Sequence, residues 1–586
     1  MCAILGIFSN TVVPPSFKLR FKKTLSLTSH RGPDQSNEVF LNNALLGFNR
    51  LSIVGVNNGL QPLANEDSTI FVLCNGEIYN YPQLRAKLEG KHSFSTDSDC
   101  EVIVHLYEDD PDGFVSQLKG QFAFIIYDMK KKRVILARDR FGINPLFYAK
   151  KSGVLFVSSE AKSILSLDST VSSELDPIAL KEMLFLYGPT PPRTAFQGIS
   201  QVIPGHILTF NVNESKVIEN RRYWNLPEKV ARPESQITKE FLRLFSAAVE
   251  RRTQGADQSV AVYLSGGMDS SAVAAILKKT GSPVVTFSVR FQDPAFDESK
   301  YQDLVSTFLK APNFSVTGDT LCDSNIFQTV WHTEHPLLRT APLPLYSLSH
   351  LVHSKGKKFV CCGEGADEML LGYPVFLKGA SSIQDKLHDY SSIDDLFVYC
   401  QQTGQQMVDS LKEKTSKKWS IPIDSIRLPQ MLEVETKLSR YLLVQQGDRQ
   451  SMSHGIEQRF PFLDEDLVDY LFSLPDEQLN KCVLGKKVLK ENLRTLLPAA
   501  VIDRKKQGYL SPMAQQLYDS SVIQNLAATS ETVEFIKIIK RYYNLKKVQQ
   551  LVNKFQNKKL SDVETIGLLL VLSTVVLHEQ FFGGPS

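Results

Sequence analysis

The second residue of the chain is a cysteine, in the opening Met1-Cys2-Ala3-Ile4-Leu5. If the initiator methionine is removed, which a small second side chain permits, residue 2 carries both a thiol and a free α-amine. The reference pKa is about 7.7–8.0 for an α-amine and about 8.5 for a thiol, so near neutral pH the amine can accept the thiol proton. Cys2 is therefore a candidate nucleophile with its own base, although a cysteine here can also simply begin a buried strand.

Polar residues that follow three strand-like runs could form a pocket for a free amino acid. Arg50 ends one run, Glu77 follows the pair Asn75-Gly76, and Asp99 precedes a helical pattern. An amino acid carries a carboxylate, which an arginine binds well, and an ammonium group, which needs a carboxylate partner. An attacked amide also needs donors for its oxyanion, and the Asn75 side-chain amide and the Gly76 N–H are adjacent candidates.

A second cluster has the chemistry of a phosphate-binding loop. The run Leu264-Ser265-Gly266-Gly267-Met268-Asp269-Ser270-Ser271 follows an apolar strand and opens a helix. Consecutive glycines and hydroxyls at a helix N-terminus present several N–H groups to a phosphate. The Gly-Lys-Ser/Thr ending of a Walker A loop is absent, so this is a different kind of loop.

The chain has 586 residues and divides into two parts with different patterns of apolar and polar residues. Up to about residue 210 it has short strand-like runs and few helical patterns, which predicts an α+β domain over 2–210 with much antiparallel sheet. A polar, proline-bearing stretch predicts a linker over 211–235. Over 236–586, helices alternate with apolar strands and then dominate, which predicts an α/β domain with a parallel sheet and a helical C-terminal region. The expected strands of the first domain cover 44–48, 70–73, 122–127, 134–137, 155–158 and 207–210.

Composition restricts the partners. A net charge of +3 gives no support for a nucleic-acid partner. The eight cysteines form no CxxC pair, which argues against a structural zinc site and is typical of reduced thiols in the cytoplasm. The most apolar segment, Ile566 to Leu577, is too short to span a bilayer, so we expect no membrane partner. Ser561 and Glu564 before it have capping-box spacing, which predicts a buried helix.

The motifs resemble a known family in order along nearly the whole chain. Class II glutamine amidotransferase domains are similar in Met1-Cys2, Arg31-Gly32-Pro33-Asp34, Asn49-Arg50-Leu51, Asn75-Gly76-Glu77 and Ser98-Asp99. ATP pyrophosphatases are similar in Ser265–Ser271, Gly363-Glu364-Gly365-Ala366-Asp367 and Arg504-Lys505-Lys506. The chain is identified as a member of the glutamine-hydrolysing asparagine synthetase family.

This resemblance implies a fold and a set of site residues. The first domain would have two layered antiparallel sheets of the N-terminal-nucleophile type, and the second a pyrophosphatase-loop sheet. In the first domain, Cys2 would cleave glutamine, Asn75 and Gly76 would form the oxyanion hole, and Arg50, Asn75, Glu77 and Asp99 would bind the substrate. In the second, Glu364 and Lys506 would be catalytic and Asp269 and Asp367 would hold Mg²⁺. ATP would contact Leu264, Ser265, Gly266, Gly267, Asp269, Ser270, Ser271, Val289, Cys362, Gly363 and Glu364.

The resemblance also implies the reaction, in which ammonia from glutamine attacks an acyl-adenylate and gives an amide, AMP and pyrophosphate. The partners would be glutamine, ATP and a carboxylic acid, and the sequence allows a homodimer. The acceptor remains open, because leucines and prolines replace several expected polar residues in His335–Pro344, which contains Arg339. Asparagine synthesis and amidation of another acid both fit. A non-catalytic homologue and a β-lactam synthetase-like cyclase fit less well, because the catalytic positions, Cys2 included, are filled.

Overall fold

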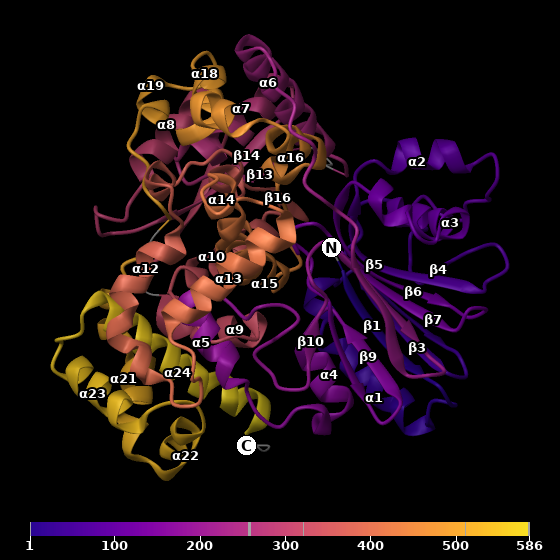
Figure 1. Ribbon diagram of the computed structural model, residues 1–586, viewed down its shortest axis with the longest axis horizontal. Coiled ribbons are helices and arrows are strands. Elements are labelled where there is room, and N and C mark those ends of the chain that lie inside the picture. The colour runs from indigo at the N-terminus through magenta and orange to yellow at the C-terminus, as the bar shows by residue number, and fades with distance from the viewer. Residues whose placement is uncertain (1, 256–258, 320, 510, 584–586) are drawn as a thin grey trace.

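A computed structural model describes residues 2–255, 259–319, 321–509 and 511–583, so Met1, whose removal the sequence leaves open, lies outside the described residues. Figure 1 shows an antiparallel β-sandwich on one side, a parallel sheet with its helices on the other, and a helical C-terminal region below that sheet. The beginning of the first strand lies where the sandwich meets the second half. This arrangement places residue 2 at the junction between the two halves.

The sandwich consists of two six-stranded sheets, as the sequence predicts. Strand β1 is central in the first sheet and entirely buried, because its seven residues are apolar or small. The first sheet has the order β10 (Ser200–Gln201), β8 (Phe147–Lys151), β9 (Val154–Ser158), β1 (Ala3–Ser9), β3 (Ala44–Arg50), β2 (Gln35–Phe40). The second has the order β12 (Lys216–Arg222), β11 (His206–Asn211), β7 (Arg133–Arg138), β6 (Gly120–Asp128), β5 (Ile70–Ile78), β4 (Leu63–Ala64).

Strand registers bring the predicted glutaminase residues to one end of the sandwich. In the antiparallel pair β1–β3, Ala3 lies opposite Asn49, so Cys2 comes next to Arg50 at the end of β3. In the pair β5–β6, Gly76 lies opposite Phe122.

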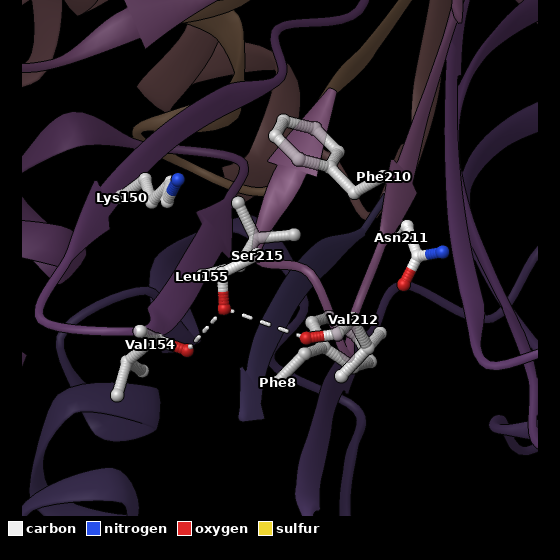
Figure 2. Close-up of a pocket in the computed structure, with 9 residues that line it drawn as sticks. Phe8, Lys150, Val154, Leu155, Phe210, Asn211, Val212 and Ser215 are labelled. Carbon is white, nitrogen blue, oxygen red and sulfur yellow. Dashed lines mark hydrogen bonds between the residues drawn. The ribbon is translucent and has the colours of Figure 1, made fainter. Parts of the chain in front are cut away.

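At the other end of β1, a cavity of about 10 Å³ lies between the sheets, where Ser215 Oγ donates to the carbonyls of Gly153 and Val212 (Figure 2). That space holds at most one water molecule, so no substrate site lies there.

Four helices cover the outer faces of the sandwich. Helices α1 (Pro15–Ser26) and α4 (Ala161–Leu167) pack on the first sheet, and α2 (Tyr81–Leu88) and α3 (Val102–Asp109) lie on the second. Helix α5 (Pro177–Leu186) leaves the sandwich and packs against α12 (Ser382–Tyr390) and α13 (Gly404–Trp419) of the second half (Figure 1).

The expected linker over 211–235 is too long at its N-terminal side. Residues 216–222 form strand β12, which pairs with β11 and extends the second sheet. Strand β12 was not recognised in the sequence because its side chains are mostly polar, and an edge strand with one solvated face carries no run of apolar residues. The irregular connection therefore occupies only 223–233, before α6 (Glu234–Arg251).

The second half contains a five-stranded parallel sheet, as predicted. Its order is β15 (Asn313–Thr317), β14 (Val284–Arg290), β13 (Val260–Tyr263), β16 (Phe359–Cys361), β17 (Glu457–Arg459). The helices of this half up to residue 354 are α6, α7 (Met268–Lys279), α8 (Ser299–Leu309), α9 (Leu321–Thr333) and α10 (Pro342–Ser354). The edge strand β17 touches the first half, since the Gln121 side chain donates to the Gln458 carbonyl at 2.8 Å.

The rest of the chain is mostly helical. It comprises α11 (Ala366–Met369), α12, α13, α14 (Arg427–Glu433), a π-helix (Val434–Asp448), α15 (Arg449–Met452), α16 (Glu465–Phe472), α17 (Asp476–Gln478), α18 (Lys487–Leu493), α19 (Ala499–Ile502), α20 (Met513–Asp519), α21 (Ser521–Ala528), α22 (Val533–Tyr542), α23 (Leu545–Gln556) and α24 (Asp562–Phe582). The predicted capping box at Ser561 and Glu564 is present.

Helix α24 is longer than the apolar segment Ile566 to Leu577 that was expected to be too short for a membrane. It is 21 residues long, which by length and composition is enough to cross a membrane, whereas the apolar segment alone was too short. In this fold, 78% of its most apolar window is buried inside the protein. The helix packs against α9, α22 and α23, as a core helix does (Figure 1).

Candidate active sites

Cys2 and Asn75 lie in direct contact at the junction of the two halves. The backbone N–H of Cys2 donates to Asn75 Oδ1 at 2.6 Å, and the Cys2 thiol lies 3.9 Å from the Leu51 carbonyl. The Asn75 Nδ2 group is buried and has no hydrogen-bond partner among the described residues. An amide donor held this way beside a thiol is available to an oxyanion.

Backbone packing fixes the position of Gly76 next to that donor. An added Cβ at Gly76 would lie 2.2 Å from the Gln121 carbonyl oxygen, so no larger residue fits without a shift of the backbone. Asn144 Nδ2 donates to the Asn75 carbonyl at 2.6 Å and holds the same segment from the other side. Burial raises the pKa of the Cys2 thiol to about 11, so the thiol is protonated at neutral pH and needs a base to react.

Arg50 is held rigidly by the loop that follows it. Its guanidinium donates to Gln35 Oε1 at 2.9 Å and to the carbonyl oxygens of Val54, Gly55 and Val56 at 2.6–3.2 Å. It forms no ion pair with a carboxylate in the described part of the chain. A fixed arginine without an acidic partner is suited to a substrate carboxylate.

Asp99 and Glu77 are buried close together on the other side of Gly76. Asp99 Oδ2 accepts from the Ile78 N–H at 2.7 Å, where a 3-10 helix (Asp99–Glu101) meets the end of β5. Burial, with repulsion from Asp99 and then Glu457, raises the pKa of Glu77 well above its usual range. Burial likewise raises the pKa of Asp99. Two acids in this state are stabilised by an added cation, such as the ammonium group of an amino acid.

The predicted phosphate loop lies between β13 and α7. Gly267 N–H donates to Ser265 Oγ at 3.2 Å, and Ser271 Oγ donates to the Gly267 carbonyl at 2.7 Å. Gly266 has φ of +76°, and an added Cβ there would lie 2.8 Å from the Gln302 nitrogen. The turn after β16 packs against this loop, because a Cβ at Gly363 would lie 2.7 Å from the Ser270 nitrogen.

Two carboxylates and two lysines meet beside this loop. Lys486 Nζ lies 2.7 Å from Asp269 Oδ1 and 2.6 Å from Asp367 Oδ1. Lys506 Nζ lies 2.6 Å from Asp367 and 3.5 Å from Asp269. Burial opposes the charge of Lys506, but Asp367 and Asp269 outweigh it and raise the lysine pKa. The structure thus brings Asp269, Asp367 and Lys506 together and places Lys486 beside them.

The remaining predicted ATP residues border the same loop. The Leu264 carbonyl accepts from Ser288 Oγ at 2.7 Å, and the Val289 carbonyl accepts from Gln302 Nε2 at 2.9 Å. Cys362 N–H donates to the Arg459 carbonyl at 2.9 Å. Burial and the negative charge of Asp269 raise the pKa of Glu364.

Lys486 could not be predicted from the sequence, because it lies in none of the motifs that resemble those of the family. Its only local signal is the preceding glycine: Gly485 and Lys486 both adopt positive φ, at 71° and 62°. A lysine in that conformation outside a hairpin is uncommon. The backbone turns there so that the buried side chain can reach both aspartates.

Buried ion pairs join the two halves between the sites. Arg31 binds Asp448 with two hydrogen bonds of 2.7 and 2.9 Å and also lies 3.2 Å from Glu160. Arg449 lies 3.1 Å from Glu334 and 3.3 Å from Glu160. Since all five side chains are almost fully buried, the two halves are fixed in one orientation by charge-assisted bonds.

A separate cavity of about 320 Å³ opens between the halves. Its lining includes Phe147, Trp224 and Trp419 together with Arg138 and Arg440. Neither Cys2 nor the Ser265 loop borders it, and its basic side chains do not suit the apolar ammonia passage that two coupled sites require. This cavity therefore does not connect the two sites.

A cluster of cations lies beside Asp367. Lys386 Nζ is buried without a hydrogen-bond partner, 3.0 Å from the centre of the Tyr187 ring, and Lys437 Nζ lies 3.5 Å from the centre of the Tyr373 ring. Burial, with repulsion from Arg339 and Lys437, holds the pKa of Lys386 well below its usual range. We call Arg339, Lys386 and Lys437 the basic cluster. Its aromatic neighbours are Tyr187, Tyr373, Tyr390 and Tyr441.

Comparisons with known proteins show the families of the two halves. Residues 1–224 match the glutamine amidotransferase domain family, and residues 240–576 match the asparagine synthase family. The chain is therefore a glutamine amidotransferase domain joined to an asparagine synthase domain. It belongs to the asparagine synthase family, as the motifs had indicated, and is an amide-forming ligase of the glutamine-hydrolysing type.

Several relatives match along most of their length. Asparagine synthetase (glutamine-hydrolyzing) 1 of Bacillus subtilis (strain 168) is 28% identical, over 92% of this chain and 91% of the relative. Asparagine synthetase (glutamine-hydrolyzing) 3 of the same organism is 30% identical, over 87% of each chain. Amidase chyE of Penicillium rubens is 27% identical, over 83% of this chain and 84% of the relative.

Among solved structures, the chain is similar to glutamine phosphoribosylpyrophosphate amidotransferase from B. subtilis. The TM-score is 0.29 at 20% identity, over 49% of this chain and 65% of that one.

Proposed function

We propose that the protein transfers the amide nitrogen of glutamine to a carboxylic acid activated by ATP. Cys2 attacks the glutamine side-chain amide, which releases ammonia and leaves a thioester, and water then hydrolyses the thioester to glutamate and the free thiol. At the second site the acid attacks the α-phosphate of ATP, pyrophosphate leaves, and ammonia displaces AMP from the acyl-adenylate. The observation that carries the proposal is the buried, unpartnered Asn75 Nδ2 group next to Cys2, because a donor kept free in the interior is expensive unless a ligand uses it.

In the glutaminase site, Arg50 would bind the glutamine carboxylate, and Glu77 with Asp99 would bind its ammonium group. Asn75 Nδ2 and Gly76 N–H would stabilise the oxyanion. The α-amine of Cys2, freed by removal of Met1, would accept the thiol proton. A base is required because the buried thiol is protonated at neutral pH.

In the synthetase site, the Ser265–Ser271 loop would hold the phosphates of ATP, with Leu264, Val289 and Cys362 around the nucleoside. Lys506 and Lys486 would neutralise the leaving pyrophosphate. Asp269 and Asp367 fit a magnesium ion, since each lies within 2.7 Å of the same lysine nitrogen and can thus converge on one cation. Bound there, Mg²⁺ would neutralise charge on the phosphates. Glu364, at the turn that packs on the loop, would contact ATP from the opposite side.

The Cys2→Ala variant tests this two-site scheme. We expect glutamine-dependent amide formation to disappear, while added ammonia still supports AMP release. The ammonia-dependent reaction should keep the KM for ATP of the unmodified protein. Loss of both reactions in a folded variant would contradict the separation of the two sites.

A second candidate concerns the acceptor. Asparagine synthesis requires aspartate, whose ammonium group needs an acidic partner. The acids beside the basic cluster are Glu433, which interacts with Lys386 and Lys437 and accepts from Ser382, and Glu368, whose pKa burial and Asp367 raise to about 7. Since Glu433 already has these partners and burial disfavours the charge of Glu368, an acid without an amine is the second candidate. Comparing AMP release with aspartate and with its amine-free analogue succinate tests the choice: faster turnover of aspartate supports asparagine synthesis.

A further inference from the structure

Four side chains that belong to neither active site converge at one edge of the glutaminase half. Glu66 lies in the turn between β4 and β5, and His92 lies in the loop after α2. His105 and Glu108 are on α3, three residues apart and therefore on one face of the helix. One ligand atom from each of the four lies within 4.8 Å of the others.

The distances between these atoms are those of metal ligands and not of hydrogen bonds. His92 Nδ1 lies 3.4 Å from Glu66 and 3.8 Å from Glu108. His105 Nδ1 lies 3.8 Å from Glu66 and 3.6 Å from Glu108. Ligands about 2.0–2.2 Å from a tetrahedral zinc ion are about 3.3–3.6 Å apart, so small movements would complete the coordination.

Two of the four groups have buried atoms without a hydrogen-bond partner in the described residues. His105 is fully buried, yet neither ring nitrogen has a hydrogen bond, and Glu108 Oε2 is also buried and unpartnered. Leaving such groups unsatisfied costs about 1–3 kcal/mol each, which a bound cation would recover. Glu66 keeps 40% of its side chain exposed, so an ion can enter from solvent.

The surroundings supply the outer contacts typical of a metal site. The second nitrogen of His92 faces Asp109 at 3.4 Å, and that of His105 faces Glu101 at 3.9 Å. The Ser93 N–H donates a hydrogen bond to Glu66 Oε1 at 2.9 Å, and Asn65 Nδ2 donates one to Glu108 Oε1 at 2.8 Å. Carboxylates behind metal-bound histidines orient the rings and raise their basicity.

We propose that Glu66, His92, His105 and Glu108 bind one divalent zinc ion, a structural site that does not take part in the amide-forming chemistry. Two imidazoles and two carboxylates in tetrahedral array are a ligand set that zinc accepts. The ion joins the β4–β5 turn, the loop after α2 and helix α3. Because α3 continues from the 3-10 helix that carries Asp99, the ion also steadies one wall of the glutamine pocket.

The test uses the full chain, purified without a histidine tag, with metal measured by mass spectrometry and zinc affinity by competition with a chromophoric chelator. We expect about one zinc per chain. Glu66→Gln and His92→Gln should weaken zinc binding at least about tenfold, in the range seen when supporting contacts of metal sites are changed. The exposed His353→Gln is the matched control and should bind zinc as the unmodified protein does.

A second measurement addresses variants that lose stability. Zinc should raise the melting temperature of metal-free unmodified protein and of His353→Gln, but not that of Glu66→Gln, whose side chain is too exposed to support folding by itself. Stoichiometric zinc binding that is equally tight in Glu66→Gln and His92→Gln would overturn the proposal. So would the absence of any zinc bound above one-tenth of an equivalent after reconstitution.

Discussion

Arg459 Nη2 lies 3.5 Å from Glu77 Oε1, so the edge strand of the synthetase sheet contacts the glutamine pocket directly. The same guanidinium binds Glu457 at 2.7 Å and the carbonyl of Arg252 at 2.9 Å, and it stacks 3.9 Å above the Phe359 ring. Strand β17 ends at Arg459, whose own carbonyl accepts from the Cys362 N–H at 2.9 Å, next to the turn that packs on the phosphate loop. One three-residue strand therefore touches both active sites.

We predict that Arg459→Gln couples a loss of stability to a loss of glutamine binding. The buried Glu77 would lose its ion pair with Arg459, and breaking one buried pair typically costs about 3–5 kcal/mol of unfolding free energy. Urea unfolding should show this loss, and the KM for glutamine should rise more than the KM for ammonia. Arg243→Gln, which removes an exposed arginine paired with Glu240, should change stability by less than about 1 kcal/mol. Equal effects of the two substitutions would contradict the role of Arg459.

Asn75→Ala should affect the rate of glutamine cleavage rather than glutamine binding. The Nδ2 donor is positioned for an oxyanion that exists only during the reaction, and removal of one such donor typically lowers kcat by about 10²–10³-fold. Glutamate release under saturating glutamine measures this change. Ammonia-dependent AMP release should stay within about twofold of the unmodified enzyme. A rise in KM with unchanged kcat would assign Asn75 to ground-state binding instead.

Lys486→Met should stop adenylation while glutamine hydrolysis continues. Methionine has a similar length but no charge, so Asp269 and Asp367 would keep only Lys506 as a shared cation, and the pyrophosphate would lose one of its two lysines. We expect ATP–pyrophosphate exchange to fall at least about 100-fold, equivalent to about 2.7 kcal/mol in the barrier. The neighbouring Lys487→Met is the control, since Lys487 is exposed and donates only to backbone carbonyls. Similar loss in both variants would show that the helix, and not the ammonium group, matters.

The antiparallel and parallel strands and the capping box were predictable because local patterns of apolar and capping residues indicate them, whereas the division into two layered sheets followed from the family resemblance. Cys2, Asn75 and Gly76 were found because they lie in motifs that resemble those of the family. Lys486 could not be predicted, because its role depends on a turn that brings it to Asp269 across 217 positions of the sequence. The proposed zinc site could not be predicted for the same reason, since His92 and His105 belong to different elements and follow no known ligand spacing.

The acid sensitivity of the fold should depend partly on His335. This buried imidazole donates from Nδ1 to the Thr333 carbonyl at 2.7 Å, and burial lowers its pKa to about 4. In the unfolded chain its pKa is about 6.5, so between pH 6.5 and 4 the unfolded state binds more protons and stability falls as the pH falls. The contribution is complete above pH 6.5 and amounts to up to about 3 kcal/mol, since each unit is worth about 1.4 kcal/mol.

His335→Gln should therefore flatten the pH dependence of the unfolding free energy between pH 6.5 and 4.5, whatever its effect at pH 7. The slope is the informative quantity because glutamine can replace the hydrogen bond but cannot be protonated in this range. The exposed His353→Gln should leave the slope unchanged. If the slope of His335→Gln equals that of the unmodified protein, other buried histidines such as His454, whose pKa is also lowered to about 4 by burial, would account for the acid sensitivity.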